Sequence, residues 1–151
     1  MKNVVKIIVV FGLISFLISC SSNNSNENNL TPHGIEYIKS TCALDKDETI
    51  LLFGTNAGFS GYKQSGNLIT DKRVASYWIE DKVKTVESSK YQEIDSIKLN
   101  DRITAITLSS SLMIYKSNGT KFELYIEADS SRLYSFYTKT IEVWYENKRQ
   151  K

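Results

Sequence analysis

The chain has 151 residues, of which 19 are basic, 17 are acidic and two are cysteines, giving a formal net charge of +2. Lys2 and Lys6 lie in an N-terminal segment that we expect to be removed, which leaves 17 basic residues against 17 acidic ones. The mature chain is therefore formally neutral, and the basic pI of the full chain, which comes mostly from the removed segment, gives no support for nucleic-acid binding. Two cysteines also exclude a disulfide-rich framework.

The first 19 residues combine a positively charged start with a short apolar run. Lys2 and Lys6 lie before the uncharged stretch from Ile7 to Ser19, which is 13 residues long. A membrane-spanning helix needs roughly 20 apolar residues, whereas the apolar part of a signal peptide needs about 7 to 15. Residues 1–19 are therefore predicted to be a cleaved signal peptide rather than a transmembrane or core helix.

The end of this segment, Leu17-Ile18-Ser19-Cys20, resembles the lipobox of bacterial lipoproteins. In that family, small residues before the cysteine fit the signal peptidase, and the thiol accepts a diacylglycerol thioether. The resemblance implies a mature chain that starts at a lipidated Cys20 and is held at a membrane of the cell envelope, because several acyl chains bind a bilayer far more firmly than one. Ser21, in place of an acidic residue, implies sorting to the outer membrane of a Gram-negative bacterium.

A polar segment separates this anchor from the rest of the chain, and residues 20–30 are predicted to be a lipidated, flexible tether. The stretch from Ser21 to Asn29 contains only Ser, Asn and Glu, so it cannot bury apolar surface to offset the entropy of ordering. Residues 31–151 have the size of one domain with a single core. With Cys20 lipidated, Cys42 has no partner in the chain, and we expect it to be a buried, inert thiol on a short helix.

The domain is expected to open with a helix and to continue as strands. Thr31 and Pro32 are typical of a helix cap and first helical position, and the helix is expected to end near Ala43. Short β-rich segments bounded by turn residues then predict a series of strands. These strands are Thr49–Phe53, Asn67–Thr70, Val74–Glu80, Lys82–Glu87, Tyr91–Leu99, Ile103–Leu108 and Leu112–Lys116.

The last part of the domain changes from strand to helix periodicity. Asn118-Gly119 predicts a tight hairpin turn, followed by a strand in which apolar and polar residues alternate up to Ile126. An amphipathic helix of about four turns then follows, with an apolar stripe of Leu133, Phe136, Tyr137, Ile141, Trp144 and Tyr145. The sequence therefore predicts a mainly β, α+β fold, in which a bent antiparallel sheet or small barrel is covered by the C-terminal helix.

The segment Ser65–Tyr77 reads Ser-Gly-Asn-Leu-Ile-Thr-Asp-Lys-Arg-Val-Ala-Ser-Tyr and resembles the strand-turn-strand signature of bacterial pleckstrin-homology-like domains. The order of the later elements agrees with that family over nearly the whole domain, so the resemblance implies a pleckstrin-homology-like fold for residues 31–151. Binding of phosphoinositide headgroups, known for the eukaryotic domains, is not implied, because Thr55–Gly61 contains no Lys or Arg.

No motif in the sequence predicts catalysis. His33 is the only histidine and has no cluster of ligands around it, so we expect no metal site and no cofactor. The run Asp45–Glu48 is interpreted as a solvated turn. Asp71 and Lys72 are interpreted as a hairpin turn, with Arg73 starting the next strand.

Most aromatic residues are expected to lie in the core, and Tyr115 and Tyr125 are the candidates for an exposed ligand-binding site, close to one another across the Asn-Gly hairpin. We expect a non-catalytic protein- or peptide-interaction module that binds an envelope partner through a sheet edge or the groove beside the terminal helix. The alternatives are a small-molecule or lipid cavity between sheet and helix and, third, an enzyme that uses the carboxylates of Asp45–Glu48.

Overall fold

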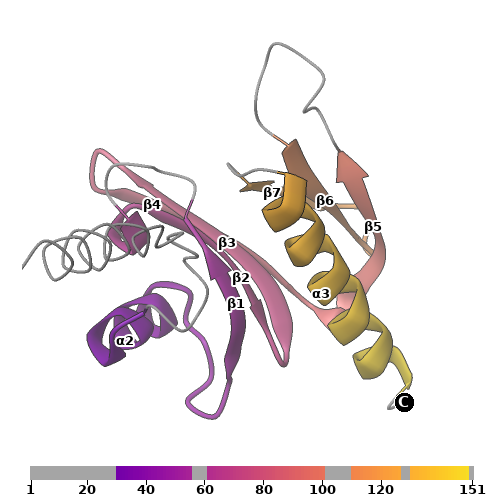
Figure 1. The fold of residues 1–151 in the computed structure, drawn as a ribbon, viewed down its shortest axis with the longest axis horizontal. Coiled ribbons are helices and arrows are strands. Elements are labelled where there is room, and N and C mark those ends of the chain that lie inside the picture. The colour runs from indigo at the N-terminus through magenta and orange to yellow at the C-terminus, as the bar shows by residue number, and fades with distance from the viewer. Residues whose placement is uncertain (1–29, 56–60, 101–109, 127–129, 150–151) are drawn as a thin grey trace, which may run out of the picture.

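The computed structural model describes residues 30–55, 61–100, 110–126 and 130–149. The elements in chain order are α2 (Pro32–Thr41), β1 (Ile50–Gly54), the 3₁₀ helix η2 (Gly61–Lys63), β2 (Ser65–Thr70), β3 (Arg73–Glu80), β4 (Val83–Lys90), the 3₁₀ helix η3 (Tyr91–Glu93), β5 (Ile94–Asn100), β6 (Ser110–Lys116), β7 (Lys121–Ile126) and α3 (Ser130–Arg149). Strands β1–β4 form one antiparallel sheet and β5–β7 a second, and α3 follows the last strand (Figure 1). The predicted mainly β, α+β fold with a C-terminal helix is confirmed.

Helix α2 begins and ends close to the predicted positions. The Thr31 hydroxyl accepts a hydrogen bond from the Gly34 amide at 3.1 Å, and Pro32 opens the first turn. Both features stabilise a helix start, since one satisfies a free amide and the other presets φ. Ile38 and Cys42 are buried against the first sheet, which confirms the predicted burial of Cys42.

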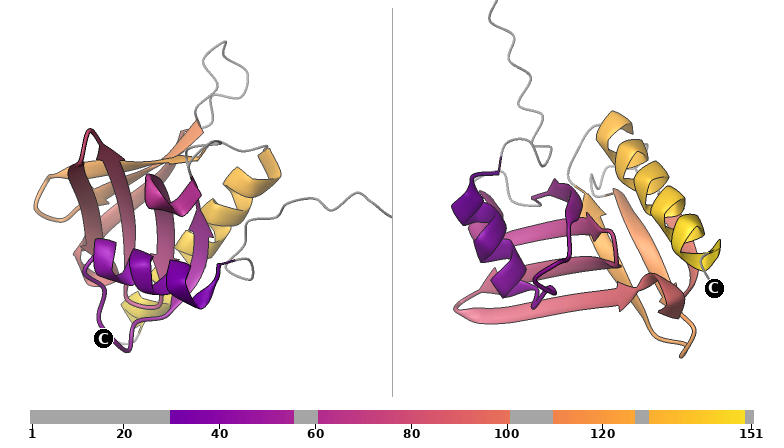
Figure 2. Two further views of the ribbon diagram at one scale, coloured as in Figure 1. Left: turned by 90° about the vertical axis from the view of Figure 1, so that its left-hand side faces the viewer. Right: turned by 90° about the horizontal axis from the view of Figure 1, so that it is seen from below.

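The first core lies between α2 and one face of the sheet β1–β4, which the helix crosses (Figure 2). Gly66 of β2 pairs with Tyr77 of β3 within this core. A Cβ atom at Gly66 would lie 2.5 Å from the Phe53 ring and 2.8 Å from the Tyr77 ring. Glycine is therefore required for the close packing of these two rings.

The second core joins the two sheets. Ile69 and Val74, on the opposite face of the first sheet, belong to the same buried cluster as Leu124 of β7 and Leu133 and Phe136 of α3. Figure 1 shows α3 lying along the second sheet, on the side where that sheet faces the first. Both sheets and α3 therefore supply side chains to one buried cluster.

Helix α3 differs from the prediction in its length and its buried stripe. It has 20 residues, more than the four turns expected. Leu133 and Phe136 are buried as predicted, but Thr140 and Val143 continue the buried stripe, while Tyr145 is exposed. Tyr145 follows Phe136 by nine residues, about two and a half turns, so its side chain points to the opposite side of the helix.

Two hairpin turns use positive φ angles in different ways. At the β6–β7 turn, Gly119 has φ of +83° and its amide donates to the Lys116 carbonyl at 2.9 Å, so the predicted turn is present. At the β3–β4 turn, Asp81 and Lys82 have φ of 49° and 67°, and Glu80 pairs with the first residue of β4. This second turn is of type I′, which is usually built with glycine.

The predicted strand Tyr91–Leu99 starts later than expected, because its first three residues form η3. The Tyr91 hydroxyl donates to the Thr70 carbonyl at 2.7 Å, and the Glu93 carboxylate accepts the Lys90 amide at 3.2 Å. These bonds fix the corner where the chain passes from the first sheet to the second. The predicted strand Ile103–Leu108, the signal peptide and most of the tether lie outside the described residues.

Candidate functional site

The two tyrosines predicted as a binding site lie on the outer face of β5–β7, but they are not neighbours. Tyr115 pairs with Lys121, whereas Tyr125 pairs with Ser111. Four residues along the ladder therefore separate the two tyrosines, a distance of about 13 Å. The prediction that they lie close together is wrong, because the short turn at Ser117–Gly119 places Lys121, and not Tyr125, opposite Tyr115.

Each tyrosine has its own surroundings. The ammonium groups of Lys98 and Lys121 lie 5.1 and 6.0 Å from the centre of the Tyr115 ring, a cation–π arrangement. Tyr125 is exposed, and its backbone carbonyl accepts a hydrogen bond from the Asn67 side chain of β2. The tyrosines therefore mark two parts of the surface rather than one site.

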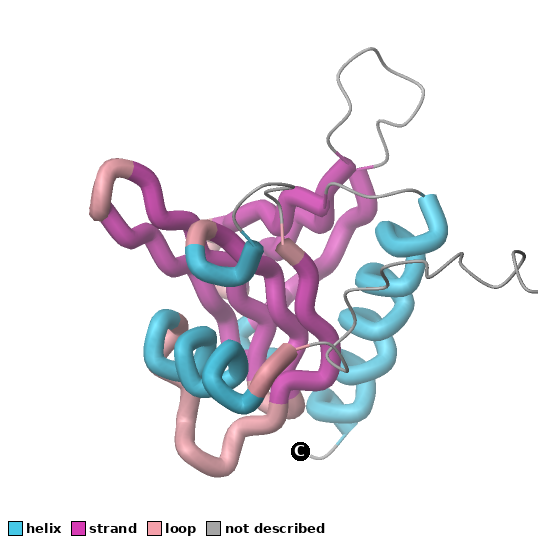
Figure 3. The backbone as a smooth tube through the Cα atoms, turned by 60° about the vertical axis from the view of Figure 1, so that its left-hand side comes forward, coloured by secondary structure: helices cyan, strands magenta, loops and turns pink. Residues whose placement is uncertain are grey.

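The β3–β4 hairpin carries two exposed apolar side chains. Trp78 is 46% exposed and Val83 is 68% exposed. Trp78 pairs with Thr85 and Val83 pairs with Glu80, so both apolar side chains point to the same face as diagonal neighbours. Figure 3 shows this hairpin projecting beyond the body of the domain. An exposed tryptophan beside another apolar residue is typical of contact surfaces.

Strand β4 forms an outer edge of the first sheet (Figure 2). Glu80 and Val83 close a two-residue hairpin and therefore form a hydrogen-bonded pair, and such pairs recur at every second residue. The backbone N–H and C=O groups between these pairs point away from β3. The residues that carry them are Lys84, Val86 and Ser88.

The far end of this edge is closed by side chains. The Lys90 amide donates to the Glu93 carboxylate at 3.2 Å, and Lys116 Nζ donates to the Ser88 carbonyl at 2.7 Å. The described residues supply no backbone hydrogen-bond partner for the outward groups of Lys84 and Val86. This open segment is the part of the edge to which another strand could bind.

A buried carboxylate lies at the end of the first sheet that is far from the β3–β4 turn. Glu48 is 0% exposed, and Arg73 contacts both of its oxygens, Nε at 2.9 Å and Nη2 at 2.8 Å. The Thr70 hydroxyl donates to Glu48 at 2.6 Å. The prediction of a solvated turn is therefore wrong for Glu48, because Arg73 and Thr70 supply the charge and the donors that allow a carboxylate to be buried.

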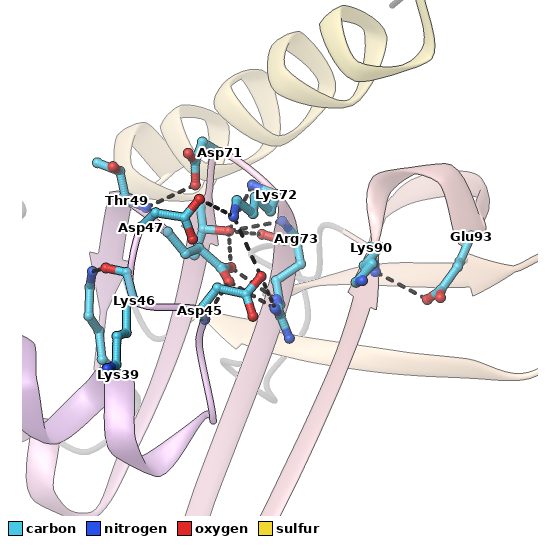
Figure 4. A network of polar contacts seen from close by, with 12 residues as sticks. Lys39, Asp45, Lys46, Asp47, Thr49, Asp71, Lys72, Arg73, Lys90 and Glu93 are labelled. Carbon is cyan, nitrogen blue, oxygen red and sulfur yellow. Dashed lines mark hydrogen bonds and ion pairs between the residues drawn. The ribbon is translucent and has the colours of Figure 1, made fainter. Parts of the chain in front are cut away.

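The other two acids of this run, Asp45 and Asp47, are exposed, as predicted. Figure 4 shows them beside Lys72 and Arg73. The Asp47 carboxylate lies 2.8 Å from Lys72 Nζ, and the Asp45 carboxylate lies 3.5 Å from Lys72 Nζ and from Arg73 Nη2. The hydrogen bond from Lys72 lowers the pKa of Asp47, and the same bond raises the pKa of Lys72. Water screens these outer pairs, so they contribute less to stability than the Glu48–Arg73 pair.

The turn Thr70–Arg73 connects several parts of the fold. The Asp71 amide donates to the Thr49 carbonyl at 3.1 Å, and the Thr49 amide donates to the Asp71 carboxylate at 2.9 Å. Asn147 of α3 donates to the Asp71 carbonyl at 3.3 Å. The predicted hairpin turn is confirmed, and its polar groups hold elements together.

Cys42 is the only cysteine within the described residues. Burial raises the pKa of Cys42 to about 12, so its side chain is a neutral thiol at neutral pH. Since the thiolate is the reactive form of cysteine, burial as a neutral thiol disfavours reaction at Cys42. Cys20 lies outside the described residues.

The surface formed by the described residues includes the following two hollows. One, of about 390 Å³, is lined by Tyr134, Thr138 and neighbouring residues of α3, and the other, of about 430 Å³, lies between Gln92 and Asn118. Neither hollow lies between a sheet and α3. In the part of the chain that the structure describes, no three His, Cys, Asp or Glu side chains converge as a metal site requires. None of the described helices has the length and apolarity needed to cross a bilayer.

The open β4 edge, with Trp78 and Val83 beside it, is thus the candidate contact surface, while the Glu48–Arg73 pair is part of the framework. Its assignment as a contact surface comes from the residues and geometry of this chain. A scan against protein-family models, a search of curated proteins and a search of solved structures all return no match.

Proposed function

We propose that the chain is a lipid-anchored lipoprotein of the cell envelope, whose domain (residues 31–151) is a non-catalytic protein- or peptide-interaction module of the pleckstrin-homology-like type. Lipidated Cys20 is the anchor, and Ser21 favours the outer membrane of a Gram-negative bacterium. The polar tether of about nine residues holds the domain about 15 to 18 Å from the lipid on average.

The anchor is supported by the sequence before the domain. The apolar run of residues 7–19 has the length of a signal peptide, and it ends in Leu17-Ile18-Ser19-Cys20. Helix α2 starts at Pro32, only 12 positions after Cys20, so a short polar segment connects lipid and domain.

The pleckstrin-homology-like assignment is supported by the succession of elements. Antiparallel sheets of four and three strands precede one C-terminal helix. The segment that carries the resemblance, Ser65–Tyr77, covers β2, its turn and most of β3. The buried Glu48–Arg73 pair gives the basic residue of that signature a structural role.

The interaction role depends on one observation, the open edge of β4. The outward backbone groups of Lys84 and Val86 lie next to the exposed side chains of Trp78 and Val83. A free strand edge with apolar side chains beside it provides the two components of strand-mediated peptide recognition, backbone hydrogen bonds for affinity and side-chain contacts for specificity.

The anchor is tested by growing cells with labelled palmitate or lipid precursor. Wild-type chain is expected to carry the label, and Cys20→Ala is expected to lose it. Cys42→Ala is the matched control, because it removes the other cysteine and should leave the label in place. An unlabelled wild type would contradict the anchor.

The interaction role is tested with a photo-crosslinking residue placed at Thr85 on β4, in the full chain within intact envelopes. A defined adduct with one envelope protein is expected. The control places the same residue at Glu146, which is exposed on α3. Equal adducts from both positions, or recovery of only bulk lipid and abundant porins, would contradict the proposed contact.

A further inference from the structure

We propose that the open edge of β4 binds an extended acidic segment of the partner, in which carboxylates alternate with apolar or small residues. This inference depends on the interaction role proposed above and adds the site and the chemistry of the partner. The segment would add a fifth strand to the sheet β1–β4, with its backbone bonded to Lys84, Val86 and the amide of Ser88.

The backbone geometry supports strand addition at this place. The outward N–H and C=O groups of Lys84 and Val86 follow directly from the pairing of Glu80 with Val83 and the alternation of an antiparallel ladder. The bond from Lys116 to the Ser88 carbonyl, and the bond from the Lys90 amide to Glu93, confirm that even-numbered residues face outward. The open length suits a short strand, not a whole second sheet.

The charges on one face of β4, the face that carries its even-numbered residues, favour an acidic partner. Lys84 and Lys90 are both even-numbered residues of β4, so their side chains lie on the face of the sheet that packs against α2. Lys84 Nζ donates to the Thr41 carbonyl at the end of α2 at 3.2 Å, which holds this ammonium group beside the edge. Lys116 adds a third ammonium group at the Ser88 carbonyl. An incoming strand with carboxylates at every second position would meet these lysines on one face.

The opposite face specifies the residues between the carboxylates. Val83 and Thr85 point to this face, and Trp78 lies one strand further in as the cross-strand neighbour of Thr85. Val83 and Trp78 are exposed. Apolar or small residues of the incoming strand would cover them and remove apolar area from water.

The same charges argue against a second copy of this chain as the occupant. In the register centred on Glu87, which pairs the outward-facing residues of β4 from Lys84 to Lys90 with those of a second copy, Lys84 of each copy lies opposite Lys90 of the other. Like charges directly opposite one another destabilise a ladder. Lysines on an edge therefore select against self-pairing while they favour an acidic strand.

The test uses the lipidated mature chain in detergent and two fluorescent peptides of about nine residues, one alternating Glu with Val or Thr and one carrying Lys in place of Glu. The acidic peptide is expected to bind at least about tenfold more tightly, with an affinity that falls as salt is added. It should also slow hydrogen exchange in the segment 83–88. Equal binding of both peptides, or no binding of either, would overturn the proposal.

The variants distinguish the edge from other surfaces. Val86→Pro removes an outward N–H and leaves the ladder with β3 intact, so it is expected to weaken binding about tenfold, whereas Val86→Thr keeps the N–H and should bind as wild type. Lys84→Glu should weaken binding of the acidic peptide and strengthen that of the basic one, which gives a second measurement if Val86→Pro lowers the thermal midpoint. Unchanged affinity in Lys84→Glu would overturn the proposal.

Failure here is distinguishable from failure of the proposed function. If the acidic peptide does not bind while photo-crosslinking from another surface position yields a defined partner, the interaction role remains and the β4 edge is wrong. If wild-type chain carries no lipid label, the anchor is wrong whatever the peptides do.

Discussion

Glu48 is a carboxylate placed where water does not reach it, and its side chain depends on neighbours for every hydrogen bond. Besides Arg73 and Thr70, the Asp45 amide donates to it at 3.1 Å. Removing charges from water is costly, so such a pair is weak support for high stability by itself. The cost of losing one partner is larger, because the other charge is then left without compensation.

Replacing Glu48 by Gln tests this at one residue. Glu48→Gln keeps the size of the side chain and removes its charge, which leaves the Arg73 guanidinium without its buried partner. We expect the free energy of unfolding to fall by about 3 kcal/mol. Urea denaturation followed by circular dichroism measures it.

Asp47→Asn is the matched control for this substitution. It makes the same change of charge one residue earlier in the chain, at an exposed carboxylate paired with Lys72. Its effect on the free energy of unfolding should be close to zero. A loss in Glu48→Gln no larger than in Asp47→Asn would refute the framework role of the buried pair.

The turn of the β3–β4 hairpin has a backbone conformation that is unusual for its residues. Asp81 and Lys82 both adopt the left-handed conformation, in which a side chain costs about 1 to 2 kcal/mol per residue relative to the right-handed one. The well-formed ladder from Arg73–Lys90 to Glu80–Val83 compensates for this cost. The turn therefore stores strain that a single substitution can relieve.

Lys82→Gly is expected to raise the free energy of unfolding by about 0.5 kcal/mol, because relief of strain exceeds the extra entropy that glycine gives to the unfolded chain. Lys84→Gly is the comparison, since it also removes one lysine but lies inside β4, where glycine destabilises and where the bond from Lys84 Nζ to the Thr41 carbonyl is lost. Thermal unfolding of both variants measures the difference. Equal midpoints for the two would show that charge, not backbone conformation, governs this hairpin.

Prediction from the sequence succeeded where the signal is local. The cap at Thr31, the alternation along β7 and the glycine turn at Gly119 each follow from a few adjacent residues. It failed where the cause is distant. Burial of Glu48 depends on Arg73, 25 residues later in the chain, and the pairing of Tyr115 depends on the register of a whole hairpin.

The main features of the candidate site also have causes that are distant in the sequence. Trp78 is an exception to the prediction that most aromatic residues lie in the core: it is exposed, because the second sheet covers only part of that face of β3. The open edge of β4 follows from the order of strands in the sheet. No local pattern reports which strand lies at an edge.

At the scale of the molecule, the second core joins both sheets and α3. Ile69 and Val74 of the first sheet pack in the same cluster as Leu124 and Leu133. The turn Thr70–Arg73 adds hydrogen bonds to the same junction. We therefore expect the domain to unfold in one cooperative transition.

The two tryptophans test this cooperativity from opposite sides of the junction. Trp78 lies on the β3–β4 hairpin, and Trp144 lies on α3. Variants Trp144→Phe and Trp78→Phe each leave one fluorescent reporter. In each variant, the urea midpoint from fluorescence is expected to equal the midpoint from far-ultraviolet circular dichroism.

Loss of Trp144 is suited to this experiment, because its indole N–H is buried without a hydrogen-bond partner among the described residues, so phenylalanine leaves no acceptor unsatisfied. An earlier fluorescence midpoint for Trp78 alone would mean that the first sheet unfolds as a separate unit. That result would rule out a single transition.

The contact between Gly66 and the rings of Phe53 and Tyr77 has a consequence for recognising relatives of this chain. Any side chain at position 66 would displace one of the two rings, so substitutions at these three positions have to be correlated during divergence. A glycine 13 residues after one aromatic and 11 residues before another is therefore the combination that a sequence must keep in order to pack its first core in this way.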